Sequence, residues 1–198
     1  LPYTTPVQAK LNLILGMNLD IEYIMPAHGI IWKDYIADII ETYKDIATQK
    51  AANKAVIVYE SVWKHTQQIA ESLAEGFSDA DMDVKVYQLS DTKSSIVMRE
   101  IMDAKVVCIG SGTYNNVMAP SVAAFLEHIR PCKFKNKKGL AFAAYGWFNQ
   151  VAKEIDTRMQ QSGIESCHDV INQCYTPSDD QLEDYFNVAK EIAKKCQE

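Results

Sequence analysis

From residue 54 onward the sequence alternates between short apolar runs and amphipathic segments, and this alternation restricts the possible folds more than any other feature. The runs at residues 55–59 and 106–109 are apolar without interruption, as expected for strands buried on both faces. The segment between residues 66 and 77 carries apolar side chains at helical spacing. Strands and helices in regular alternation predict an α/β fold with a parallel sheet covered by helices on both faces.

The predicted sheet is doubly wound and five-stranded. Val84 and Val86 alternate with Lys85 in the second strand, which is typical of an edge position, whereas the first and third strands are fully apolar and therefore central. These positions favour the strand order 2-1-3-4-5, in which ligands bind at the carboxyl ends of strands one and three. The strands are expected at residues 55–59, 83–89, 106–109, 139–144 and 167–171, and the helices at 66–77, 96–102, 119–129, 151–159 and 182–192.

The first 50 residues have a different pattern and are expected to form a short N-terminal α/β remnant, separate from a domain at residues 51–198. The polar stretch at residues 49–54 is interpreted as the boundary between the two. The elements expected in the remnant are helices at 6–17 and 33–50, a strand at 20–25 and a turn at 26–29.

Composition argues against several classes of protein. The 198 residues carry a formal net charge of −6, which argues against a nucleic-acid-binding surface. No apolar run approaches the roughly 20 residues of a membrane helix, and the N-terminus does not resemble a signal peptide. The five cysteines include no C-x-x-C pair, so we expect reduced thiols and a cytoplasmic protein. Because the chain begins at Leu1 without an evident start signal, we expect a fragment or a processed chain.

The loop after the first strand is a candidate phosphate site. A strand, a short polar loop and a helix present free backbone N–H groups at the helix start, where they bind anions. Hydroxyl groups and at least one positive charge lie in the same loop, although hydroxyl side chains in this position often serve only as helix caps. The candidate residues are Ser61, Val62, Trp63, Lys64, His65 and Thr66.

The loops after strands three and four lie at the same edge of the predicted sheet and are rich in aromatic, amide and glycine residues. Aromatic rings stack on a flat heterocycle, and the backbone beside a glycine approaches its polar edge closely. A phosphate at one end and a flat ring at the other describe FMN, although aromatic residues in loops are often only half-buried packing. The candidates are Ser111, Gly112, Thr113, Tyr114, Asn115, Asn116, Ala144, Tyr145, Gly146, Trp147 and Phe148.

A phosphoacceptor receiver domain is a rival use of this fold. That chemistry requires an aspartate at the end of the third strand, where this sequence has Gly110 and Ser111. It also requires several acidic residues after the first strand to hold a metal, and Glu60 is alone there. We therefore set the receiver domain aside.

Four motifs resemble those of flavodiiron proteins, also called A-type flavoproteins. The motifs are Ser61-Val62-Trp63-Lys64-His65-Thr66, Thr113-Tyr114-Asn115-Asn116, Pro120-Ser121-Val122 and Tyr145-Gly146-Trp147. Residues 54–198 resemble the flavodoxin-like domain of that family, and residues 1–50 resemble the tail of its metallo-β-lactamase-like domain. The resemblance implies a flavodoxin-like fold whose FMN passes electrons to a diiron centre that reduces O2 or NO. It also implies a head-to-tail homodimer and an electron donor, either rubredoxin-like or a reductase.

The resemblance places His28, within Pro26-Ala27-His28-Gly29, where the family has its last diiron ligand. The upstream H-x-E-x-D-H motif that supplies most other ligands is not in this sequence, so His28 binds metal only if those ligands come from elsewhere. We therefore predict an FMN-binding electron-transfer domain without catalytic residues of its own, the diiron centre belonging to the complete protein. The alternatives are a flavin-free interaction or dimerisation module, and an NAD(P)H-dependent flavin or quinone reductase, for which no Gly-rich dinucleotide motif is found.

Overall fold

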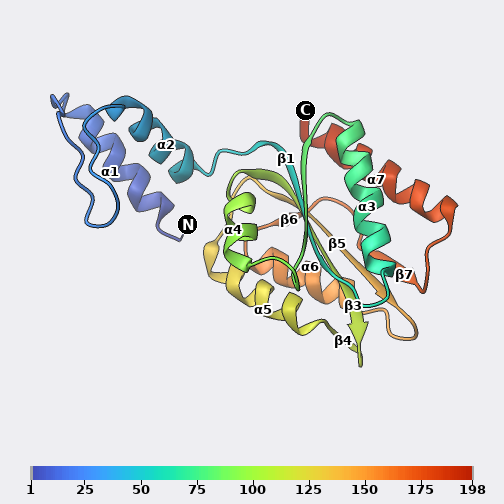
Figure 1. The fold of residues 1–198 in the computed structure, drawn as a ribbon. Helices are drawn as coiled ribbons and strands as arrows, with labels where there is room; N and C mark the ends of the chain where they lie inside the picture. The colour runs from blue at the N-terminus through green and yellow to red at the C-terminus, as the bar shows by residue number, and fades with distance from the viewer. Residues whose placement is uncertain (1, 198) are drawn as a thin grey trace. The chain divides into compact units, whose positions relative to one another are not determined.

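A computed structural model describes residues 2–197 of the chain. Its internal contacts divide the chain into two compact units, Leu1–Lys50 and Ala51–Glu198 (Figure 1). Each unit is described separately below.

The smaller unit is built from two helices, α1 (Thr4–Gly16) and α2 (Ile36–Thr48). The predicted strand at residues 20–25 is wrong, because only Ile24 pairs, in an isolated antiparallel bridge with Trp32. The second helix begins three residues later than predicted, since Tyr35 takes a left-handed backbone with φ of 59°. Many apolar side chains of this unit are exposed, among them Leu13, Leu15, Met17, Leu19, Met25, Ile30, Ile31, Tyr35, Tyr43 and Ile46.

The larger unit contains the predicted doubly wound sheet. Its strands are β1 (Ala52–Glu60), β2 (Asp83–Gln88), β3 (Ala104–Tyr114), β5 (Lys138–Tyr145), β6 (Glu165–Ser166) and β7 (Ile171–Cys174). They are parallel in the order β2-β1-β3-β5, with β6 and β7 both pairing with β5. The predicted fold class and strand order are confirmed, including the edge position of β2.

Helices cover both faces of the sheet. On one face lie α3 (His65–Asp79) and α7 (Asp179–Gln197), and on the other lie α4 (Ser94–Met102), α5 (Pro120–Ile129) and α6 (Val151–Gln161) (Figure 1). The predicted apolar face of α3 is fully buried, since Ile69, Leu73 and Phe77 are each 0% exposed. The central part of β1 is buried on both faces, as its uninterrupted apolar run predicts.

The third strand is longer than predicted. The sequence predicts a loop at residues 110–114, but this segment continues β3 and pairs in a hairpin with β4 (Val117–Met118). Asn115 and Asn116 form the turn with φ of 44° and 70°. Asparagine tolerates this left-handed backbone, which a two-residue hairpin turn of type I′ requires.

The fifth strand is also misplaced by the sequence pattern. The residues between β6 and β7 leave the ladder, so most of the predicted strand at 167–171 is irregular. Pairing resumes at Ile171, opposite Phe142, where buried and exposed residues alternate along β7. A broken edge strand of this kind offers little free backbone to other chains.

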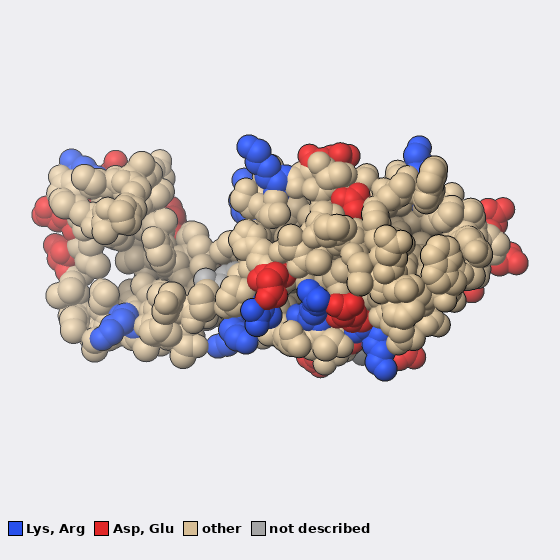
Figure 2. All heavy atoms as spheres, turned by 90° about the horizontal axis from the view of Figure 1, so that it is seen from below, with Lys and Arg blue, Asp and Glu red and all other residues tan. Residues whose placement is uncertain are grey.

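The surface carries charges of both signs. Lys and Arg side chains lie among Asp and Glu side chains on the face seen in Figure 2, which shows no extended basic patch. Among residues 2–197, no helix combines the length and the hydropathy needed to cross a membrane.

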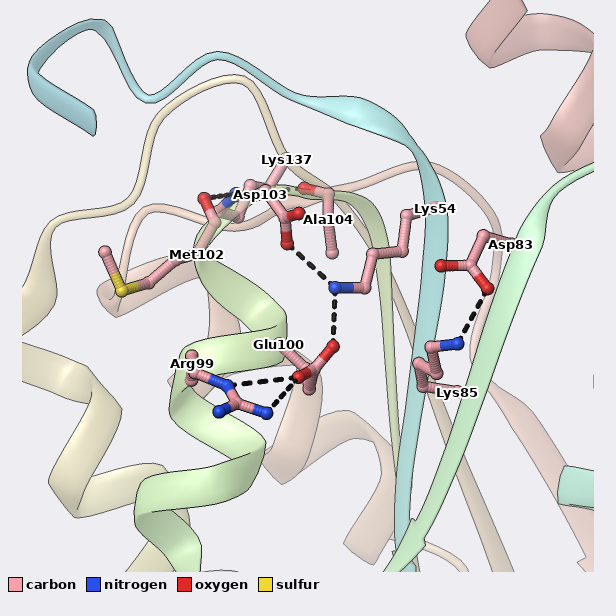
Figure 3. Close-up of polar contacts among 9 residues, drawn as sticks. All are labelled: Lys54, Asp83, Lys85, Arg99, Glu100, Met102, Asp103, Ala104 and Lys137. Atoms are coloured by element: carbon pink, nitrogen blue, oxygen red, sulfur yellow. Dashed lines mark hydrogen bonds and ion pairs between the residues drawn. The ribbon is translucent and has the colours of Figure 1, made fainter. Parts of the chain in front are cut away.

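A network of lysines and carboxylates joins α4 to the starts of the strands (Figure 3). Lys54 Nζ lies 2.7 Å from Glu100 Oε2 and 2.9 Å from Asp103 Oδ1. Lys137, only 2% exposed, donates hydrogen bonds of 2.9 Å to the carbonyls of Met102 and Ala104. Burial lowers the pKa of Lys137 from 10.5 to about 8. A cation at the end of α4 suits the carbonyls that a helix leaves unpaired there.

This buried lysine predicts a pH-dependent stability. Because the folded pKa of Lys137 is below its unfolded value, the unfolded chain binds more protons between pH 8 and 10.5, and stability rises with pH there. Relative to Lys137→Met, the wild type is expected to gain on the order of 2–3 kcal/mol across this window. Denaturant unfolding of both proteins at several pH values measures the difference, and a difference independent of pH would contradict the assignment.

Candidate functional site

A cavity of about 430 Å³ opens at the carboxyl ends of β1, β3, β5 and β7. Its volume is in the range of small-molecule sites. It is lined by Ser61, Val62, Trp63, His65, Thr66, Gly112, Thr113, Tyr114, Asn115, Ala144, Tyr145, Gly146, Trp147 and Tyr175. The three loops predicted to converge at the switch point therefore do meet around one cavity.

The first loop leads into α3 without a side-chain cap. Lys64 occupies the N-cap position with a left-handed φ of 65°, and its side chain makes no capping hydrogen bond. Thr66, in the first turn, is 1% exposed and lines the cavity. The N–H groups at the start of α3 are the ones that a helix cannot satisfy internally. Together with the helix dipole, they favour an anion at this end of the cavity.

The Glu60 carboxylate holds the loop after β1 in place. Its Oε1 accepts hydrogen bonds from the Ser61 backbone N–H at 3.1 Å and from Gln88 Nε2 at 3.0 Å. Its Oε2 accepts a hydrogen bond of 3.1 Å from Ser121 Oγ in the first turn of α5. The carboxylate, 8% exposed, thus ties the loop to β2 and α5. The sequence does not predict this role, because nothing in the pattern around Glu60 distinguishes it from any other glutamate at the end of a strand.

The β3–β4 hairpin forms the wall opposite the first loop. A Cβ placed on Gly112 would lie 3.8 Å from Thr66 Oγ1, so the two loops face each other closely. Thr113 Oγ1 is buried and has no hydrogen-bond partner among the described residues. Since buried hydroxyls are normally paired, this one points to a ligand. Burial, with a contribution from the Glu60 carboxylate, raises the pKa of Tyr114.

Two tryptophans lie at the mouth of the cavity. Trp63 comes from the first loop and Trp147 from the loop after β5, and each is 81% exposed. Indole rings are seldom left so exposed to water without a partner. Rings at the rim of a cavity provide large flat surfaces on which a heterocycle can stack.

Four of the predicted site residues do not line the cavity: Lys64, Ser111, Asn116 and Phe148. Ser111 is fully buried, and its Oγ donates to the Gly112 carbonyl at 2.7 Å and accepts from the Ala119 N–H at 2.8 Å. Its hydroxyl therefore holds the hairpin to the start of α5. Tyr175, from the loop after β7, lines the cavity and was not predicted.

A metal site is not formed by the residues that the structure describes. Between residues 2 and 197, no group of three or more His, Cys, Asp and Glu side chains is arranged to hold a metal ion. His28 is exposed in the smaller unit.

Comparison with known proteins shows the family of the chain. The family model described as Flavodoxin matches residues 57–195. An anaerobic nitric oxide reductase flavorubredoxin of Pectobacterium carotovorum is 32% identical over 196 residues, which are 98% of this chain and 39% of that protein. The structure of rubredoxin oxygen:oxidoreductase from Desulfovibrio gigas matches with a TM-score of 0.94 and 31% identity, over 99% of this chain and 49% of that one.

A flavodiiron protein from Giardia intestinalis is similar as well. It matches with a TM-score of 0.86 and 25% identity, over 96% of this chain and 48% of that one. The chain thus spans less than half the length of these relatives. The Flavodoxin family model matches most of the larger unit. The proteins that match nearly the whole chain include a flavorubredoxin and a flavodiiron protein. The chain therefore belongs to the flavodoxin family, in the form that flavodiiron proteins carry.

Proposed function

We propose that the cavity binds FMN and that the larger unit is an electron-transfer module. The observation that carries this proposal is one cavity in which the uncapped start of α3 faces a hairpin with an unpaired buried hydroxyl. Two exposed tryptophans line the same cavity. An anion site at one end and aromatic surfaces at the other match a molecule with a phosphate and a flat ring system. Among common cofactors, FMN has this form.

Residues of this chain would hold the phosphate and the ring by different means. The Ser61 and Thr66 hydroxyls and the N–H groups of the first loop would hold the phosphate. Thr113 would supply a hydrogen bond, and Trp63 and Trp147 would cover the ring and exclude water. When bound, the flavin supplies the capacity to take up one or two electrons, while the protein orients it and sets its potential.

We also propose that residues 1–50 are the C-terminal part of a metallo-β-lactamase-like domain. Two observations support this assignment: relatives about twice as long as this chain, and the many apolar side chains that the smaller unit exposes. In the complete protein a diiron centre would accept the electrons, and His28 would be a ligand only with ligands from the preceding part. The names of the relatives suggest O2 or NO as the final acceptor.

The proposed partners follow from the same relatives. A rubredoxin-like protein or a reductase would deliver electrons, since relatives are named flavorubredoxin and rubredoxin oxygen:oxidoreductase. A homodimer would bring the flavin of one subunit to the acceptor of the other. We place the protein in the cytoplasm, where cysteines remain reduced, as the five free cysteines here would require.

The visible absorption spectrum of the purified protein tests the flavin proposal. We expect flavin bands, either as isolated or after addition of FMN and removal of the excess, and bleaching on anaerobic reduction. A protein that remains colourless after incubation with FMN would contradict the proposal. Rapid direct reduction of the bound flavin by NADH or NADPH would instead favour a flavin or quinone reductase.

A further inference from the structure

We propose that the loop after β7, residues 175–178, is a fourth wall of the cavity and that Tyr175 binds the flavin ring and sets its affinity. This inference rests on the proposed flavin site and assigns it a residue outside the three predicted loops. Tyr175 lines the cavity and is 59% exposed, so a large part of its ring is available to a ligand.

The backbone of the sheet carries Tyr175 to the cavity. Cys174 is paired with Tyr145 at the end of the β5–β7 ladder. One residue later, the Tyr175 N–H donates a 2.8 Å hydrogen bond to the Tyr145 carbonyl. The backbone pairing thus continues into the loop and places Tyr175 beside the loop that follows β5.

The ring of Tyr175 lies against Gly146. A Cβ placed on Gly146 would be in contact with the phenol group, 3.3 Å from Cε1, 3.4 Å from the hydroxyl oxygen and 3.5 Å from Cζ. The tyrosine ring therefore packs directly against the glycine backbone. Because Gly146 also lines the cavity, the ring and the glycine backbone form one continuous surface there.

The backbone of Tyr175 makes a tight turn at the end of β7. Its φ of 57° is left-handed, a region that bulky side chains adopt less readily than glycine or asparagine. Glycine or asparagine would make the same turn at less cost.

Further contacts fix the loop at both of its ends. Thr176 Oγ1 and His65 Nε2 lie 3.1 Å apart in a hydrogen bond, which joins the loop to the first residue of α3. At the start of α7, the Ser178 N–H donates to Gln181 Oε1 at 3.0 Å and the Gln181 N–H donates to Ser178 Oγ at 3.3 Å. This reciprocal pair is a capping box. The fourth wall is thus connected to the phosphate end as well as to the ring end of the cavity.

Substitution of Tyr175 tests the inference. We expect Tyr175→Ala to weaken FMN and riboflavin equally, about tenfold, because the ring contacts a part that both ligands share; aromatic stacking has effects of this order. Tyr175→Phe is expected to bind within about twofold of the wild type, because it retains the ring. Tyr43→Ala, which removes an exposed tyrosine that is not among the residues lining the cavity, is the matched control and should change neither affinity.

Tyr175→Asn serves as a second truncation, since asparagine adopts the left-handed backbone readily. Dissociation constants come from fluorescence titration of FMN and of riboflavin, and circular dichroism of the unliganded variants verifies the fold. If both truncated variants bind the two flavins as the wild type does, the role of Tyr175 is overturned. If the wild type itself binds no flavin, the proposed function fails, and the inference fails with it.

Discussion

Replacing Ser61 and Thr66 together by alanine will weaken FMN binding by roughly 3 kcal/mol or more, since a hydrogen bond to a charged group contributes about 1.5–3 kcal/mol. Both side chains line the cavity at its anion end, and Thr66 lies in the first turn of α3. Riboflavin affinity is expected to change little, because riboflavin has no phosphate. Parallel titrations of the double variant with the two flavins measure the effect.

Thr157→Ala is the matched control for this pair. Among the contacts described, its exposed hydroxyl on α6 bonds only to the Lys153 carbonyl, and Thr157 is not one of the residues that line the cavity. It should therefore leave both affinities unchanged. An equal loss of FMN and riboflavin affinity in the Ser61 and Thr66 double variant would place the phosphate elsewhere.

Gly76→Ala will destabilise the larger unit by roughly 3 kcal/mol, the upper part of the usual range for overpacking. On helix propensity alone, alanine would stabilise α3 by about 1 kcal/mol. The added Cβ, however, would overlap the backbone carbonyl of Phe186 in α7 and lie only 2.8 Å from Ala189 Cβ. A backbone atom cannot rotate away, so α3 and α7 must separate, and the packing loss exceeds the gain in propensity.

Urea unfolding of Gly76→Ala and of Glu75→Ala measures this effect. Glu75 precedes the glycine on the same helix and is exposed, so its substitution should change stability by only a few tenths of a kcal/mol. A Gly76→Ala variant as stable as the wild type, or more stable, would mean that the two helices do not pack as closely as described.

The sequence predicts the sheet well where burial alone decides the pattern. The apolar run in β1 and the stripe on α3 follow from burial, which leaves a clear period in the sequence. The β3–β4 hairpin was missed because glycine, threonine and asparagine after Ile109 are typical of loops. The fifth strand was misplaced because its pairing with β5 is set by contacts distant in the sequence. No local pattern records such pairing.

The candidate site, like the sheet, could be predicted only in part from the sequence. The three loops could be predicted from topology, since the carboxyl ends of neighbouring parallel strands meet at one edge. Tyr175 could not, because its place depends on the ladder between β7 and β5. The anchoring role of Glu60 depends on Gln88 and Ser121, which come from separate elements and meet only in the folded chain.

Titration of the flavin-free protein with FMN, followed by flavin fluorescence, tests the central claim most directly. We expect the flavin fluorescence to be quenched, with saturation at one FMN per chain, because the aromatic residues of the cavity would contact the ring. We also expect FMN to bind at least tenfold more tightly than riboflavin. Fluorescence that rises with added FMN as in buffer alone, or equal affinity for FMN and riboflavin, would contradict the account.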